Sequence, residues 1–326
     1  MQLVYTRRLV AADPSPHCPG DGTHNGETGV SNDGELKDIG FIGTGIMGKS
    51  MAGHLLDAGF TLHLYNRSRD KAVALIDRGA TWHSDVASLA RACDAVITVV
   101  GYPVDVRQVY LGDSGLIANA RPGAILIDMT TSNPSLARLI ADTARARDVR
   151  TLDAPVSGGD TGAREGTLAI MVGGEAETFD RAMPLFQAMG KMIRLLGPAG
   201  AGQHTKMVNQ IVISGTIMGV AEGMAYARRC GLDAETVLDV IGTGAAAGAQ
   251  LRSQAPKMNA GDFAPGFYIH HFLKDMGIAL DEAQAMGLDL PSLALSKSRY
   301  EELAALGYGE DGTQALLRLY EDDPGV

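Results

Sequence analysis

One stretch of this chain of 326 residues predicts its fold: Ile39-Gly40-Phe41-Ile42-Gly43-Thr44-Gly45-Ile46-Met47-Gly48. An apolar strand leads directly into a G-x-G-x-x-G match, and a helical stretch follows as far as Gly59. In that setting the glycines predict a tight turn, close approach of the backbone to a pyrophosphate, and close packing of helix on sheet. The predicted cofactor-binding residues here are Gly43, Thr44, Gly45, Ile46, Met47 and Gly48. A glycine-rich turn without a ligand is the alternative.

Short apolar strands then alternate with helices. Strands are predicted at 61–65, 95–100 and 124–127, and helices at 70–78 and 134–147. Strands that are apolar throughout indicate a parallel sheet covered on both faces. After Gly202 the strand signals stop. We therefore predict an α/β fold, a Rossmann-type doubly wound parallel sheet followed by a smaller all-helical domain. The expected divisions are a disordered tail (1–37), the dinucleotide-binding domain (38–199) and a helical domain for substrate and oligomerisation (200–326).

Composition excludes several classes of function. With 45% hydrophobic and 20% charged residues the chain has an ordinary globular make-up. A net charge of -10 argues against nucleic acid or an anionic membrane as a partner. No apolar run reaches the roughly 18–20 residues of a membrane span. Three cysteines and no secretory signal favour a cytoplasmic location. His17, Cys18 and His24 lack a fourth ligand, so no metal is predicted.

The end of the second strand bears on the choice of cofactor. An NAD-binding fold carries an Asp or Glu here for the ribose 2′-hydroxyl, but this chain has Asn66-Arg67-Ser68. Arg67 is suited to a 2′-phosphate through a charge-assisted hydrogen bond, and Asn66 and Ser68 can also donate. We therefore predict NADP, with NAD as a possible cofactor. A solvated loop cation is the other interpretation of Arg67.

Two further segments carry chemistry. Asp153-Ala154-Pro155-Val156-Ser157-Gly158-Gly159 places a hydroxyl and consecutive N–H groups at one turn, which suits a carboxylate. A plain turn is the alternative, and the turn alone does not decide.

The second segment is the start of a long helix. Lys206, Asn209 and Gln210 are spaced i, i+3 and i+4, so they share one face. Near a helix N-terminus and among apolar residues, a lysine loses hydration and meets the helix dipole, and both lower its pKa toward the range for proton transfer. A lysine snorkelling from a partly exposed helix fits the same pattern. His204 is a rival acid or base, but it points elsewhere.

These motifs together resemble the β-hydroxyacid dehydrogenase family, which includes 3-hydroxyisobutyrate dehydrogenases, tartronate semialdehyde reductases and glyoxylate/succinic semialdehyde reductases. The resemblance rests on the glycine loop, the turn at 153–159, the Gly-x-x-x-Lys-x-x-Asn helix start, and the run that begins at Lys274-Asp275. It covers residues 38 to about 320.

The resemblance implies roles for individual residues. Lys206 would be the catalytic acid/base, and Asn209 would orient the substrate or hold Lys206. The remaining implied binding residues are Ser157, Gly158, Gly159 and Gln210 for the substrate and Val100, Gly101, Thr131 and Lys274 for the cofactor. Among these, Thr131 would lie against the nicotinamide ribose. Gln210 stands where many relatives have a second Asn, which leaves the substrate open.

The expected activity is hydride transfer between a nicotinamide and a small, carboxylate-bearing 3-hydroxy acid or semialdehyde acid. The alternatives are an imine reductase-like enzyme, which usually replaces the lysine, and a catalytically silent NADP-binding module. Phe267, Tyr268, His270 and His271 are either pocket wall or helical core. The small and apolar residues of 211–227 and 241–251 predict a homodimer or homotetramer.

Overall fold

The computed structural model describes residues 36–321, and the expectations about the tail through residue 35 lie outside this range. Leu36 is already buried against the core of the sheet domain, and the carbonyl of Lys37 accepts a hydrogen bond from Thr61 N. Residues 36 and 37, which lie before the predicted boundary at 38, thus also contact the sheet domain.

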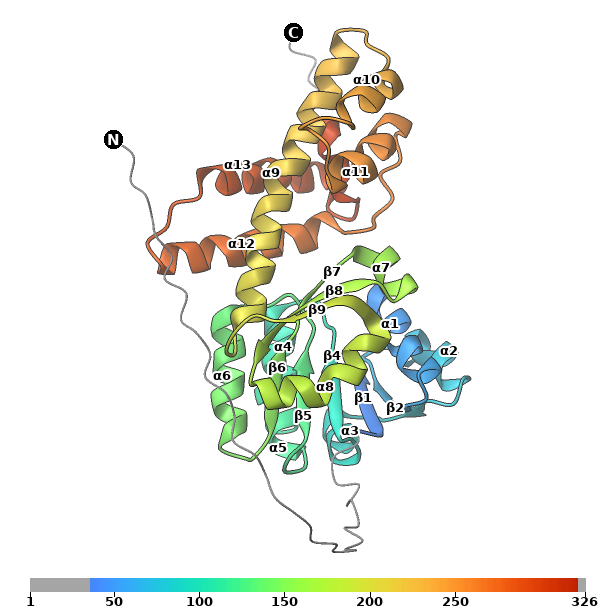
Figure 1. Ribbon diagram of the computed structural model, residues 1–326, viewed down its shortest axis with the longest axis vertical. Coiled ribbons are helices and arrows are strands. Elements are labelled where there is room, and N and C mark those ends of the chain that lie inside the picture. Colours follow the sequence, from blue (N-terminus) through green and yellow to red (C-terminus); the bar gives the residue numbers. More distant parts are fainter. Residues whose placement is uncertain (1–35, 322–326) are drawn as a thin grey trace, which may run out of the picture. The chain divides into compact units, whose positions relative to one another are not determined.

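A sheet of nine strands forms the first half of the described chain (Figure 1). Its main path runs in the order β3-β2-β1-β4-β5-β6-β8-β7, with β9 beside β8. The strands are β1 (Asp38–Ile42), β2 (Thr61–Tyr65), β3 (Thr81–Trp82), β4 (Ala95–Thr98), β5 (Ile125–Asp128), β6 (Arg150–Asp153), β7 (Val156–Ser157), β8 (Leu168–Gly174) and β9 (Gly190–Leu195). Pairing is parallel from β3 to β6, and β8 is antiparallel to both β6 and β7. The doubly wound α/β prediction is confirmed, with this antiparallel addition.

Helices cover both faces of the sheet. They are α1 (Ile46–Asp57), the 3₁₀ turn η1 (Arg69–Ala72), α2 (Val73–Ile76), α3 (Val86–Ala92), α4 (Pro103–Leu111), α5 (Leu116–Asn119), α6 (Pro134–Arg145), α7 (Gly159–Glu165) and α8 (Ala176–Met189). Ile97 and Ile127 pack with α1 and α8, whereas their neighbours Val96 and Leu126 pack with α3, α4 and α6. Alternate residues of one strand thus belong to different hydrophobic cores, one on each face of the sheet. Because both faces are buried, these strands are apolar throughout.

The rest of the described chain is helical. It comprises α9 (Ala201–Arg229), α10 (Ala234–Ile241), α11 (Ala249–Ala260), α12 (Ile269–Ala285), α13 (Pro291–Leu303), the π-helical turn η2 (Ala304–Tyr308), the 3₁₀ turn η3 (Thr313–Leu317) and α14 (Arg318–Glu321). A separate core forms here around Ile217, Phe272, Met276 and Tyr300. No helix within residues 36–321 is long and apolar enough to span a bilayer.

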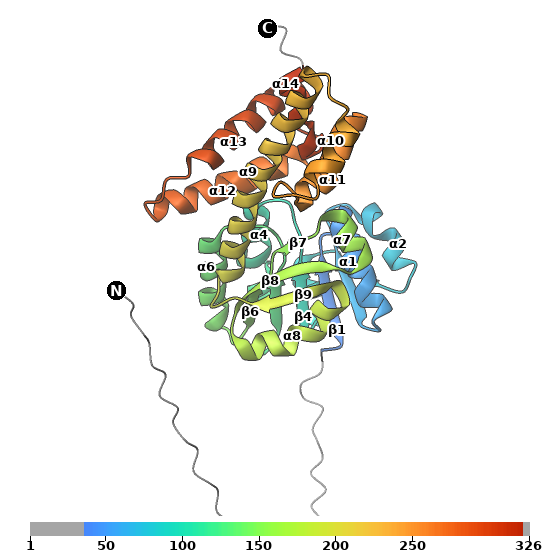
Figure 2. The same cartoon turned by 45° about the horizontal axis from the view of Figure 1, so that its top comes forward.

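The long helix α9 begins against the sheet and continues into the helical bundle (Figures 1 and 2). The Asp153 carboxylate, at the end of β6, accepts hydrogen bonds from Gly200 N (2.7 Å) and Gln203 N (2.8 Å). A Cβ on Gly202 would lie 2.4 Å from the Met171 carbonyl oxygen, so glycine is required at this contact. Asp153 therefore fixes where α9 starts.

Candidate active site

The phosphate loop predicted from the glycines joins β1 to α1. Gly43 has φ +99°, and a Cβ there would lie 2.0 Å from the Val99 carbonyl oxygen. A Cβ on Gly48 would lie 1.9 Å from the carbonyl oxygen of Gly43. Both positions therefore demand glycine for internal reasons, the first for the turn and the second for packing of the helix on the loop.

Gly45 is different, because a Cβ there would meet nothing within 4 Å. It is the N-cap residue of α1 and no side chain caps this helix end. Beside it, Thr44 Oγ1 is buried and has no hydrogen-bond partner among residues 36–321. Uncapped N–H groups, an orphan hydroxyl and space in front of a glycine fit the pyrophosphate of a dinucleotide.

The end of β2 lies beside this loop. Asn66 Oδ1 accepts a hydrogen bond from Thr44 N (3.2 Å), and Asn66 Nδ2 donates to the Ser68 carbonyl (2.8 Å). The Arg67 side chain is 81% exposed and lies 3.4 Å from Asp105 Oδ1. Asp105 lies in the first turn of α4, and the sequence did not predict that its carboxylate would lie beside Arg67.

The loops after β4 and β5 meet at the next point along the sheet edge. Val100 N donates to Thr130 Oγ1 (3.0 Å), and Gly101 faces the ring of His271. From α12, Lys274 Nζ donates to the Thr131 carbonyl (2.7 Å). The predicted cofactor residues Val100, Gly101, Thr131 and Lys274 are thus brought together from three separate elements.

The turn predicted for a substrate carboxylate follows β6. Ser157 ends the short strand β7, and Gly158 and Gly159 have φ +133° and +63°. Such positive φ values favour glycine at both positions. Val156, just before this turn, provides the carbonyl oxygen that receives the Lys206 ammonium at 2.9 Å. The turn predicted to bind a substrate carboxylate and the predicted acid/base are therefore adjacent.

Lys206 lies in the second turn of α9 and is only 8% exposed. Burial lowers its pKa to about 8, with the carboxylate of Asp275 opposing the shift and the ammonium of Lys274 adding to it. A lysine with this pKa is protonated at neutral pH and gives up its proton far more readily than a solvated lysine. The geometry argues against the snorkelling interpretation. His204 instead contacts Arg138 (3.1 Å), on α6.

Next to Lys206, a chain of hydrogen bonds joins side chains of α9 and α12. Asn209 Nδ2 donates to Gln210 Oε1 (2.7 Å), and Gln210 Nε2 donates to Asp275 Oδ2 (2.6 Å). Asp275 is buried and pairs with Lys274 at 3.1 Å. Because the amide of Gln210 is buried and bonded at both ends, the structure favours a supporting position for it over direct contact with substrate.

Two further buried groups were not singled out from sequence. Gln203 lies one turn before Lys206 and bonds to the loop after β5. Its position three residues before Lys206, on the same face of the helix, is the feature of the sequence that could have indicated a place near the site. Asp128, at the end of β5, accepts from Thr130 N (3.0 Å), and burial raises its pKa to about 7.

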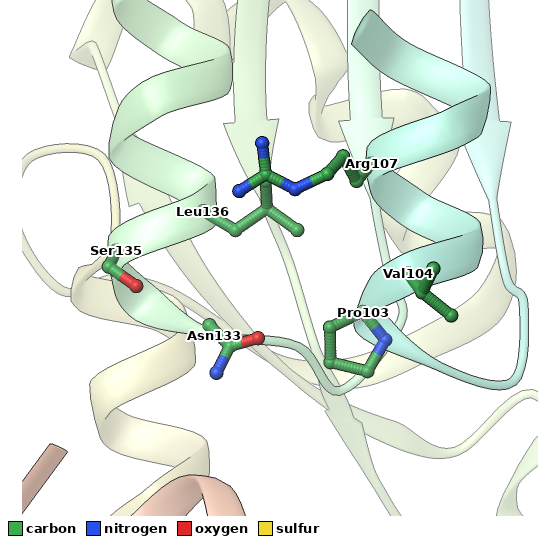
Figure 3. A pocket seen from close by; sticks show the side chains of 6 residues that line it. All are labelled: Pro103, Val104, Arg107, Asn133, Ser135 and Leu136. Atoms are coloured by element: carbon green, nitrogen blue, oxygen red, sulfur yellow. The ribbon is translucent and has the colours of Figure 1, made fainter. Parts of the chain in front are cut away.

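A pocket of about 340 Å³ opens between the first turns of α4 and α6 (Figure 3). It is lined by Pro103, Val104, Arg107, Asn133, Ser135 and Leu136. None of the predicted site residues lines it, although it adjoins the loops that carry Gly101 and Thr131. Within residues 36–321 no group of three or more His, Cys, Asp or Glu side chains is arranged to hold a metal ion.

Family models match both halves of the described chain. The family model for the NAD binding domain of 6-phosphogluconate dehydrogenase matches residues 38–197. The model described as NAD-binding of NADP-dependent 3-hydroxyisobutyrate dehydrogenase matches residues 200–320.

Similar proteins are found among curated sequences and solved structures. An uncharacterised oxidoreductase of Bacillus subtilis is 55% identical over 284 residues, covering 87% of this chain and 99% of the relative. A probable 3-hydroxyisobutyrate dehydrogenase-like protein of Arabidopsis thaliana is 49% identical over 284 residues, covering 87% and 85%. The structure of Mycobacterium tuberculosis 3-hydroxyisobutyrate dehydrogenase with L-serine has a TM-score of 0.80 at 30% identity, covering 87% and 99%.

Fold, site and relatives define a nicotinamide-dependent oxidoreductase that acts on CH–OH groups. The chain belongs to the β-hydroxyacid dehydrogenase family, which confirms the resemblance noted in its sequence.

The glycines of the phosphate loop give a paired prediction. Gly48→Ala should destabilise the protein by about 1–3 kcal/mol, the usual cost of overpacking. Gly45→Ala should leave the melting temperature almost unchanged, because its Cβ meets no protein atom, yet weaken cofactor binding. Thermal melts and fluorescence titration with NADPH on both variants measure this. A large drop in melting temperature for Gly45→Ala would contradict the assignment.

Proposed function

We propose that this protein transfers a hydride between NADP(H) and a small 3-hydroxy acid or semialdehyde acid, with Lys206 as proton donor and acceptor. The observation that carries the proposal is the buried Lys206 ammonium, bonded to the Val156 carbonyl next to the turn at 157–159. Its pKa of about 8 suits proton transfer in either direction near neutral pH.

The bound nicotinamide supplies the hydride chemistry, and the protein supplies position and the proton. In reduction, negative charge develops on the carbonyl oxygen of the substrate, and Lys206 Nζ donates a proton to it. In oxidation the same nitrogen takes the hydroxyl proton. Asn209 stands one turn further along α9, where it would orient the substrate or hold Lys206.

The substrate class follows from the turn at 157–159. The Ser157 hydroxyl and the N–H groups of Gly158 and Gly159 would bind a carboxylate. This supports a short acid whose carbonyl or hydroxyl carbon then lies near Lys206. The similar Mycobacterium tuberculosis structure, described with L-serine, is consistent with a small 3-hydroxy acid.

The activity is tested by following NADPH oxidation with glyoxylate, succinic semialdehyde, methylmalonate semialdehyde, tartronate semialdehyde and a few imines. We expect turnover with an acid semialdehyde. Turnover of imines alone would indicate an imine reductase-like enzyme, and no turnover with any compound would favour a silent NADP-binding module.

Lys206→Ala should lower kcat by about 10²–10⁴, the span of general acid–base catalysis, and leave NADPH affinity nearly unchanged. Lys206→Arg should not restore activity, because a guanidinium scarcely releases its proton. Since the donor must be protonated, kcat/KM for reduction in the unmodified protein should fall as pH rises through about 8, and that for oxidation should rise. Substantial activity in Lys206→Ala would end the assignment.

We also propose a preference for NADP(H) over NAD(H). The residues at the end of β2 include no carboxylate, and the exposed Arg67 guanidinium is available for a 2′-phosphate. Asp105 is the competing partner of Arg67, so a bound 2′-phosphate would take its place. Breaking the ion pair between Arg67 and Asp105 would cost little free energy, because the arginine side chain is exposed to solvent.

Arg67→Ala should raise the KM for NADPH about tenfold or more while hardly changing that for NADH, since a hydrogen bond between charged groups contributes about 1.5–3 kcal/mol. Arg69→Ala is the matched control, because Arg69 is also exposed but lies over the Trp82 ring. Initial rates with both cofactors measure the effect. Equal kinetics with NADPH and NADH in the unmodified protein would overturn the preference.

We further propose that the protein is a homo-oligomer, a dimer or tetramer, associating through α9. Gly215, Gly219 and Gly223 form a stripe along this helix, and a Cβ at each would meet nothing within 4 Å. The exposed Val208 and Val212 continue the stripe toward the N-terminal end of the helix. A helix of a second copy could approach closely along such a face.

Light scattering at micromolar concentration should give a multiple of 34.2 kDa. Gly219→Glu, in the middle of the stripe, should shift the protein toward the monomer. Val240→Glu on α10, at an exposed apolar residue away from the stripe, should not. A monomeric mass for the unmodified protein would rule out the association.

A further inference from the structure

Gln203 makes an unusual set of contacts in the first turn of α9. Its side chain is 0% exposed. The amide oxygen accepts a hydrogen bond from Ser132 N (2.9 Å), and the amide nitrogen donates to the Thr130 carbonyl (2.7 Å). One side chain thus satisfies two main-chain groups of the loop after β5, 71 and 73 residues away along the chain.

The loop that Gln203 holds is part of the predicted cofactor site. Thr131, between its two bonded neighbours, is the residue expected against the nicotinamide ribose. The carbonyl of Thr131 in turn receives Lys274 from α12. Three consecutive residues, 130–132, are therefore fixed through their main chain by side chains from the helical half.

Gln203 also lies three residues before Lys206 on the same helix. Residues spaced i and i+3 are neighbours on a helix surface. The main-chain N–H of Gln203 is bonded to Asp153, so the residue is held at its backbone as well as at its amide. Gln203 therefore connects the loop at 130–132 to the turn of α9 that carries Lys206, and both its side chain and its backbone N–H are hydrogen-bonded.

We propose that Gln203 is a positioning residue that sets the nicotinamide-binding loop relative to Lys206, so that hydride and proton are delivered to the same carbonyl group. The inference rests on the proposed function. It differs from a purely structural role in one respect: loss of the amide should impair the hydride step more than cofactor binding or folding.

The test compares two buried glutamines. Gln203→Met removes both amide hydrogen bonds at similar volume. Gln314→Met is the matched control, because Gln314 is also buried and its amide donates to the carbonyls of Asp262 and Ala264, outside the candidate site. Both variants should lower the melting temperature.

Only Gln203→Met should lower kcat, by about 10–100-fold, the effect expected when reacting groups are misplaced by about 1 Å. Its Kd for NADPH should change far less. The kinetic isotope effect with NADPH deuterated at the transferred position should exceed that of the unmodified protein. A kcat and isotope effect unchanged in Gln203→Met would overturn the proposal.

A second variant decides the matter if Gln203→Met does not fold. Gln203→Glu keeps the acceptor for Ser132 N and can donate to Thr130 only while its carboxyl is protonated. Its kcat should therefore fall with rising pH earlier than that of the unmodified protein, and a superimposable pH profile would overturn the proposal. Inactivity of the unmodified protein toward every substrate tested would count against the proposed function, not against Gln203.

Discussion

The capping of α9 by Asp153 is the contact on which the arrangement of the site depends. A carboxylate at the end of β6 accepts two main-chain hydrogen bonds from the first turn of a helix that continues into the other half of the molecule. Burial raises the pKa of Asp153, while the helix N–H groups counter that shift and favour its charged form. Because α9 starts there, Lys206 reaches the Val156 carbonyl, and the proposed acid/base lies beside the turn at 157–159 that is proposed to bind the substrate carboxylate.

The charges near Lys206 are balanced by few groups. Two lysines, 206 and 274, enter a buried region in which Asp275 is the carboxylate paired to Lys274 and bonded to Gln210. Burial outweighs the attraction of Asp275 and leaves the pKa of Lys206 at about 8. A stronger counter-charge would raise the pKa of Lys206 and make release of its proton harder. Without any counter-charge, the two ammonium groups would repel each other.

Sequence alone predicted the parts of the fold with strong local signals. The glycine loop, the strand at 61–65 and the start of a helical half at about 200 follow from apolar period and glycine placement. The strand β7 was not predicted, because its two residues are too few to show a period. The strand β8 falls on an apolar stretch that the sequence does show, but its antiparallel pairing with β6 and β7 was not predicted. The approach of Asp105 to Arg67 and the contacts of Gln203 join residues far apart in the chain. Their side chains carry no local signal of the partner, so only the packed structure places them.

Four residues that link the sheet half and the helical half share one chemical property. Asp153, Gln203, Lys206 and Lys274 each form a hydrogen bond with a main-chain group of the other half. Every residue except proline offers the same N–H and C=O, so the identity of the residue on the receiving side is free to vary. Substitutions at positions such as 131 and 156 can therefore change the side chains beside the candidate site while these main-chain hydrogen bonds are kept. A scaffold joined in this way tolerates changes of side chain beside the candidate site without losing the bonds that hold its two halves together.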